Sequence, residues 1–362
     1  MRPEGIDHLQ VCRYGKWTDK RVVIKTQLEN SMNQKKEETP RHRLRAVAFV
    51  LFLTTCSIVL FAQGPPRMRK HRVSEAKTLE LVPANKKPPA TNRVRITERD
   101  GFRVIESNDI PKHTVGEFPN RGNPNAIAAQ SWTIKIPLQP APNDTITPLH
   151  QSTSHGPPNM PFGVGINGVL FEPGTAEFWM GDRHADWNYE ALGGAVGLGL
   201  DSNHAHVQPG GIYHYHGLPT GLLEELNFPA GKEDHNRHSP LIGWAADGFP
   251  VYYAFGYKQA EDPKSGIAKL TTSFQLKKGE RPSGSVGPGG RYDGAFIQDY
   301  EFVAGTGELD ECNGRFCVTP DFPEGTYAYF LTDAWPVIPR GFRGTPVLLK
   351  ERRHGAHPRP PR

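Results

Sequence analysis

Four histidines lie close together in the middle of the sequence, in two pairs with one residue between the members of each pair. In a β-strand, residues i and i+2 point to the same face, so each pair would present two imidazoles on one side. Imidazole nitrogen is a ligand for zinc, copper, nickel and iron. The pattern therefore indicates a transition-metal site, provided that both pairs face the same way. The two pairs are His204-Ala205-His206 and His214-Tyr215-His216.

The loop between the pairs decides whether the four imidazoles converge. A two-residue loop at 209–210 would point the pairs to opposite faces, whereas a three-residue loop at 209–211 would place His206 opposite His214. Three-residue loops commonly combine a type I turn with a following glycine in the left-handed region. Proline at the first loop position and glycine at the third suit that geometry. We therefore expect the three-residue loop and four metal ligands, His204, His206, His214 and His216.

A packed, metal-free histidine cluster is the alternative interpretation. Bare imidazoles side by side would repel one another once protonated, so we favour a bound metal ion, zinc or copper. Asp247 could orient an imidazole from behind, as carboxylates often do at metal sites, or it could only cap its own turn. Other residues could contribute from neighbouring segments, although loop positions and turns explain them more simply: Glu190, Asp201, His155, His235 and His238.

The residues around the histidines resemble a known family. The stretch 210–219 reads GGIYHYHGLP, and similar blocks flank it, with GINGVLF at 165–171 and SPLIGWAADGFP at 239–250. The blocks LDECNG and FPEGTY follow at 309–314 and 322–327. In this ordered series, over roughly 130–335, the chain is similar to the YHYH domain family. The resemblance implies an exported protein of a largely uncharacterised, mainly bacterial family, and it implies no particular activity.

Short apolar runs separated by glycine and proline dominate the rest of the chain. Gly 38 and Pro 34 together make 72 of 362 residues, with no collagen-like repeat. We expect short helices at 186–194 and 220–227 only. Many short strands favour an all-β sandwich or barrel-like domain with long Gly/Pro-rich loops. The expected strands lie within 96–110 and at 132–138, 163–170, 178–180, 212–216, 251–255, 300–303, 326–332 and 345–349.

The N-terminal region has the layout of an export signal. Arginines at 41, 43 and 45 precede an uncharged apolar run at 46–62, which is short for a membrane span. We expect a signal peptide there, or an uncleaved anchor, with 1–31 resulting from a start codon assigned too early. We further expect a basic Pro-rich linker at 63–95, the β-rich domain at 96–349 and a basic disordered tail at 350–362.

Cysteine usage fits a secreted or periplasmic location. Cys12 and Cys56 lie in segments that export would remove, which leaves Cys312 and Cys317. An even pair in an oxidising compartment is a disulfide candidate, and the intervening Asn313-Gly314 is typical of a tight turn. We expect a hairpin with a Cys312–Cys317 disulfide at its mouth. Two free thiols or a metal clip are the alternatives.

Charge and composition restrict the partners. Residues 100–349 carry 17 Lys and Arg against 28 Asp and Glu, so this part has a net charge of −11, and we expect no nucleic-acid binding. Three functions remain open: a non-catalytic metal-binding module, a metal-dependent hydrolase or oxidoreductase with an open coordination position, and a metal-free glycan-binding module. The glycan module, or a site for another extracellular small molecule, would use exposed aromatic residues such as Trp179, Trp187 and Tyr189.

Overall fold

A computed structural model describes residues 71–149, 161–182, 186–233 and 235–349. The expected signal segment, residues 1–31 and the basic tail lie outside these ranges, as do Cys12, Cys56 and His155. Among the residues within them, no helix combines the length and the apolar character that crossing a bilayer requires.

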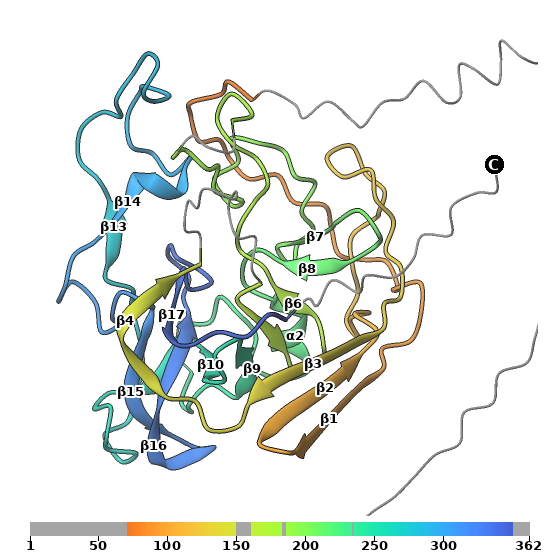
Figure 1. Ribbon diagram of the computed structural model, residues 1–362, viewed down its shortest axis with the longest axis vertical. Coiled ribbons are helices and arrows are strands. Elements are labelled where there is room, and N and C mark those ends of the chain that lie inside the picture. The colour runs from red at the N-terminus through yellow and green to blue at the C-terminus, as the bar shows by residue number, and fades with distance from the viewer. Residues whose placement is uncertain (1–70, 150–160, 183–185, 234, 350–362) are drawn as a thin grey trace, which may run out of the picture. The chain divides into compact units, whose positions relative to one another are not determined.

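Short strands make up nearly all the regular structure, which confirms the all-β class (Figure 1). One α-helix, α2 (Thr220–Glu225), and one 3-10 helix, η1 (Ile297–Asp299), complete the set of described elements. The strands are β1 (Val94–Arg99), β2 (Phe102–Ser107), β3 (Trp132–Pro137), β4 (Pro142–Pro148), β5 (Gly163–Gly165), β6 (Leu170–Phe171), β7 (Ala205–Val207), β8 (Tyr213–Tyr215), β9 (Leu241–Ala245), β10 (Pro250–Tyr253), β11 (Phe255–Tyr257), β12 (Ile267–Lys269), β13 (Phe274–Leu276), β14 (Tyr300–Phe302), β15 (Gly314–Thr319), β16 (Phe322–Leu331) and β17 (Gly341–Gly344).

The largest sheet has eight strands in the order β15-β16-β10-β9-β5-β6-β8-β7. Its pairs are antiparallel except for β10 with β16 and β6 with β8. Strands β1, β2 and β3 form a separate antiparallel sheet, and β11-β12, β13-β14 and β17-β4 form two-stranded ribbons. The hairpin β7-β8 therefore lies at one edge of the large sheet, where β7 is the last strand.

The two larger sheets share one hydrophobic core. Ile105 and Ile134, from the three-stranded sheet, pack in the same buried cluster as residues of the eight-stranded sheet such as Val251. The Arg103 guanidinium lies 4.4 Å from the ring centroid of Trp244, which joins β2 to β9. The two sheets therefore pack against each other through this core. On β10 the adjacent Tyr252 belongs to a different cluster, so the large sheet is buried on both faces there.

The small elements match the sequence-based expectations only in part. The expected strand at 132–138 and the expected helix at 220–227 are confirmed by β3 and α2. The expected helix at 186–194 is wrong, because Asn188 forms a β-bridge with Phe178 and Tyr189 forms one with Phe296. Tyr189 is fully buried, so an extended backbone here delivers an aromatic side chain to a second core.

The segment from residue 71 to residue 92, which we expected to belong to a linker, packs along the β-rich unit. The Lys77 amide donates to Gly193 at 3.0 Å, and the Val82 amide donates to Leu200 at 2.8 Å. His71 also forms a β-bridge with Trp179, so contacts with the β-rich unit begin upstream of the expected boundary at 96. Segment 71–92 thus lies against the loop that leads into β7.

The expected Cys312–Cys317 disulfide is wrong, since both cysteines are free, buried thiols. Gly314 does not close a hairpin but begins β15 opposite Tyr329 of β16. Cys312 packs in the core shared by the two larger sheets, whereas Cys317 packs in the cluster on the opposite face of the large sheet. A bridge would require both side chains on the same side.

Candidate metal centre

The β7-β8 hairpin has the predicted register. His206 pairs with His214, and the neighbouring pairs are Ala205 with Tyr215 and Val207 with Tyr213. A loop of three residues, 209–211, therefore joins the strands, as expected. The Pro-Gly-Gly loop thus sets the register of the two histidine-bearing segments locally.

The turn itself differs from the expected type I turn. The Gly211 amide donates to the Gln208 carbonyl at 3.0 Å, and Gly210, the third residue of that turn, has a φ of +95°. A positive φ at this position is the signature of a type II turn, and only glycine adopts it without strain. Gly211 also has a positive φ, and a Cβ on it would lie 2.4 Å from the Cβ of Ala128. Both glycines are thus required by the loop.

One face of β8 is a buried tyrosine face, formed by Tyr213 and Tyr215. The Tyr213 hydroxyl donates to the Asp201 carboxylate at 2.8 Å. The Tyr215 hydroxyl accepts from Asn167 at 2.9 Å and lies 2.6 Å from the Nε2 atom of His113. Buried hydroxyl groups need such partners, so this network holds β8 in one position. Asp201, which we considered as a support for the imidazoles, supports a tyrosine.

The histidine face lies on the other side, because neighbouring residues of a strand alternate. The Nε2 atom of His216 lies 3.0 Å from the Nε2 atom of His214 and 3.0 Å from that of His206. The ring centroids are 4.6 to 4.7 Å apart, and one candidate ligand atom from each ring lies within 4.8 Å of the others. We call His206, His214 and His216 the histidine triad.

Hydrogen bonds to the backbone set the proton positions on two rings of the triad. The Nδ1 atom of His206 lies 3.0 Å from the carbonyl of Leu198. The Nδ1 atom of His214 lies 3.3 Å from the carbonyl of Ile212. A carbonyl only accepts, so each Nδ1 donates, and each Nε2 of the neutral ring carries a lone pair. The Nε2 atom of His216 lies between these two lone pairs and could donate a hydrogen to only one of them. The arrangement is therefore compatible with a cation bound between the rings.

Burial keeps the His206 ring neutral. It lowers the pKa of His206 to about 4, although the hydrogen bond to the Leu198 carbonyl opposes this shift. His214 and His216 are also buried, with 1% and 2% of their surface exposed. Neutral imidazole is the form that binds metal ions. A proton shared between these buried rings would carry a positive charge away from water, which burial disfavours.

His204 does not join the triad. Its backbone keeps the expected register, because its carbonyl accepts from the His216 amide at 2.8 Å. Its φ of +54° lies in the left-handed region and turns the side chain away, so that Nδ1 donates to the Leu218 carbonyl at 3.0 Å. The imidazole lines a separate cavity of about 260 Å³. The expected set of four converging histidines is thus corrected to three.

The family model described as YHYH protein matches residues 133–344, more than half of the chain and all of the hairpin. The chain belongs to the YHYH protein family. No curated protein and no solved structure matches it.

In this YHYH protein the repeated tyrosine and histidine have separate tasks. The tyrosines anchor the strand in the interior, while His214 and His216 supply two members of the triad. The third member, His206, comes from the paired strand β7. Sequence reasoning missed His113, which contacts the tyrosine face from a segment about a hundred residues away, and no local pattern marked it.

Asp247 does not reach the triad of this YHYH protein. Its carboxylate accepts from the Tyr329 hydroxyl, from the Gly344 amide at 2.9 Å and from the Phe249 amide at 3.3 Å. It therefore fixes its own turn and joins it to β16 and β17. The carboxylate of Glu190 is likewise engaged elsewhere, accepting from Arg340 at 2.7 Å.

The remaining histidine candidates also lie elsewhere in the YHYH fold. His235 stacks on Phe228, with ring centroids 3.7 Å apart. His238 is 6% exposed, so it is buried, although its loop position suggested an exposed side chain.

The triad can hold one ion with room for further ligands. With metal–nitrogen bonds of about 2.0–2.1 Å, two nitrogens 3.0 Å apart would subtend roughly 95° at the ion. That angle is smaller than the roughly 109° of a tetrahedron, so the three rings would cluster on one side of the ion. A set of three histidines with an open position is a donor set found in catalytic zinc sites.

Proposed function

We propose that this protein binds one transition-metal ion, zinc or copper, through the Nε2 atoms of His206, His214 and His216. The proposal is based on two distances of 3.0 Å, from the Nε2 atom of His216 to the Nε2 atoms of His214 and His206. Neutral rings with inward lone pairs repel one another, and a divalent cation converts this repulsion into attraction. The buried surroundings oppose a proton in the same place.

A metal-dependent hydrolase or oxidoreductase is the second candidate function. The observation that favours it is the number of ligands, because three imidazoles leave at least one position for water or a substrate, whereas four would close a tetrahedral site. The metal-free glycan module has less support. Trp187 and Tyr189 are 8% and 0% exposed, and Trp179 packs against them in the same cluster.

Metal analysis of untagged protein tests the proposal. We expect about one equivalent of zinc or copper per chain, and an X-ray absorption spectrum with three imidazole nitrogens and at least one non-histidine ligand. A spectrum with four imidazoles would contradict the triad and would favour a closed site. Protein that contains no metal and takes up neither ion on titration would refute metal binding altogether.

Acid should weaken metal binding less steeply than it does for a site of three ordinary histidines. Protons and metal compete for Nε2, and three imidazoles with a pKa near 6.5 would lower the logarithm of the apparent affinity by up to about 3 per pH unit at pH 5. Because the pKa of His206 is about 4, this ring is still neutral at pH 5, so protons do not compete with the metal for its Nε2 atom there. We therefore expect a slope of at most about 2 between pH 5 and 6 in a chelator competition titration. A slope of 3 would mean that His206 protonates like an exposed imidazole.

Export is a separate proposal, based on the basic and apolar segments at 41–62. The mature protein would then meet its metal ion, and any glycan or other small molecule that it binds, outside the cytoplasm. Cell fractionation with N-terminal sequencing of the mature chain tests this: a new N-terminus close to Gln63 is expected.

A further inference from the structure

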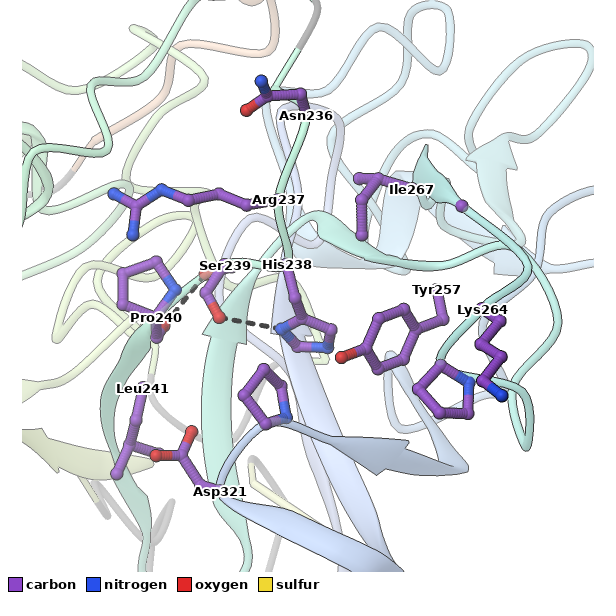
Figure 2. Close-up of a pocket in the computed structure, with 13 residues that line it drawn as sticks. Asn236, Arg237, His238, Ser239, Pro240, Leu241, Tyr257, Lys264, Ile267 and Asp321 are labelled. Atoms are coloured by element: carbon purple, nitrogen blue, oxygen red, sulfur yellow. Dashed lines mark hydrogen bonds between the residues drawn. The ribbon is translucent and has the colours of Figure 1, made fainter.

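A cavity of about 550 Å³ lies apart from the histidine triad. It is lined by the segment that leads into β9, by the β11-β12 ribbon and by the turn between β15 and β16, and it shares no lining residue with the triad. Figure 2 shows the imidazole of His238 among the lining side chains, with the hydroxyl end of Tyr257 pointing toward it. A cavity of this size suits a small organic molecule, since one water molecule occupies only about 30 Å³ in the liquid.

His238 presents an unused acceptor. Its Nδ1 atom lies 2.8 Å from the carbonyl of Ser239, so Nδ1 donates and Nε2 carries the lone pair. The side chain is 6% exposed, and among the described residues no group forms a hydrogen bond with Nε2. A buried acceptor without a partner costs about 1–3 kcal/mol, so such an atom beside a cavity indicates a ligand.

His113 provides an internal comparison. It is 8% exposed, and its Nδ1 atom lies 2.8 Å from the carbonyl of Thr114, the next residue, just as in His238. The Nε2 atom of His113, however, has the hydroxyl of Tyr215 at 2.6 Å. Two buried histidines thus share one local geometry, and a protein hydroxyl satisfies the Nε2 atom in one of them, whereas in the other Nε2 has no hydrogen-bond partner among the described residues.

The surroundings of His238 restrict the charge of the ligand. Desolvation by burial lowers the pKa of His238, and the charge of Arg315 adds to this, so the imidazole is neutral and accepts. The cavity is also lined by two cationic side chains, Arg237 and Lys264, and one anionic side chain, Asp321, a balance that disfavours a cation. Its apolar walls include Pro240, Leu241 and Ile267.

We propose that this cavity binds a small neutral organic molecule whose hydroxyl group donates to the Nε2 atom of His238 while its apolar body packs against the proline and aliphatic walls. This site is independent of the metal centre. The hydroxyl of the ligand takes the position beside Nε2 of His238 that the Tyr215 hydroxyl takes beside Nε2 of His113.

Three matched probes test the proposal on the full-length protein: benzyl alcohol, toluene and benzylammonium. Histidine side-chain nitrogen resonances report on each ring. We expect benzyl alcohol to shift the His238 Nε2 resonance saturably and to leave that of His113 unchanged. Toluene lacks the donor, so its affinity should be about threefold to tenfold weaker, which is the effect of one neutral hydrogen bond. Benzylammonium should bind more weakly than the alcohol.

A His238→Phe variant provides the second arm, because phenylalanine keeps the ring volume and removes the acceptor. We expect it to bind benzyl alcohol no more tightly than toluene. Equal affinities of the wild-type protein for these two probes, or a cavity that holds water only and gives no saturable shift, would overturn the proposal. Tighter binding of benzylammonium would also overturn it. If the variant does not fold, the three probes still decide on the wild-type protein.

Discussion

Replacing both His206 and His214 by alanine is expected to abolish stoichiometric metal binding. The double variant retains only one triad imidazole, and one nitrogen ligand does not hold a divalent ion against water. The wild-type protein should also lose stability when the metal is chelated, by about 4 kcal/mol if the free metal had been present at a thousand times its dissociation constant. In the double variant a chelator should leave the melting temperature unchanged. Metal analysis after gel filtration and melting curves with and without EDTA measure both effects.

His204→Asn is the matched control for this experiment. It removes an imidazole from the same hairpin, and asparagine tolerates the left-handed φ of +54° better than alanine does. Because the Nδ1 atom of His204 donates to Leu218 and its ring lines a different cavity, this variant should keep its full equivalent of metal. Metal retained by the folded double variant would refute the triad as the metal site. Metal lost from His204→Asn would restore the four-histidine arrangement that the sequence suggested.

The contrast between His206 and His204 shows what a sequence can specify. The pairing of His206 with His214 follows from a three-residue loop whose proline and glycines restrict the backbone locally, so it could be predicted. The orientation of His204 depends on the preceding turn, in which the His204 amide donates to the Asp201 carbonyl at 2.8 Å. The Asp201 carboxylate also accepts from the Asn203 amide at 2.9 Å. This side-chain turn leaves a signal, Asp-Ser-Asn before the histidine, that an assumption of regular strand overlooked.

Other errors arose where distant packing outweighs a local pattern. The Asn313-Gly314 pair is typical of a hairpin turn, but the Asn313 side chain donates to the Phe330 carbonyl at 2.9 Å and fixes this point beside β16. Likewise, Tyr189 lies in a segment bounded by a helix start signal at Asp186 and a stop signal at Gly193, yet its ring stacks on Phe296, with ring centroids 4.5 Å apart. Contacts between residues so far apart in the chain have no local signature. The sequence alone therefore predicted the class of fold and the β7-β8 hairpin better than the segments around Tyr189 and Asn313.

Replacing Arg281 by methionine is expected to destabilise the protein by about 3–5 kcal/mol, which is the usual effect of leaving a buried charge without its partner. Arg281 and Asp299 are both fully buried, and their closest contact is 2.6 Å. Arg281 also pairs with Asp293 and donates to the Ser74 carbonyl at 2.5 Å. This one guanidinium therefore joins the N-terminal segment at 71–92 to the loops near η1. Chemical denaturation of the two proteins measures the difference.

Asp299→Asn, combined with Arg281→Met, tests where this loss of stability comes from. If most of it comes from the unpaired Asp299 carboxylate, adding Asp299→Asn to Arg281→Met should cost much less than it does in the wild-type background, because a neutral amide needs no cation. The Asp299 carboxylate also accepts from the Gly294 amide at 3.0 Å, a contact that the amide oxygen of asparagine can keep. A strongly non-additive cycle is thus expected, with the double variant more stable than the sum of the single losses implies by at least about 1 kcal/mol. Strict additivity would show that Arg281 acts through its packing on Phe296, whose ring centroid lies 5.0 Å from the guanidinium, rather than through its charge.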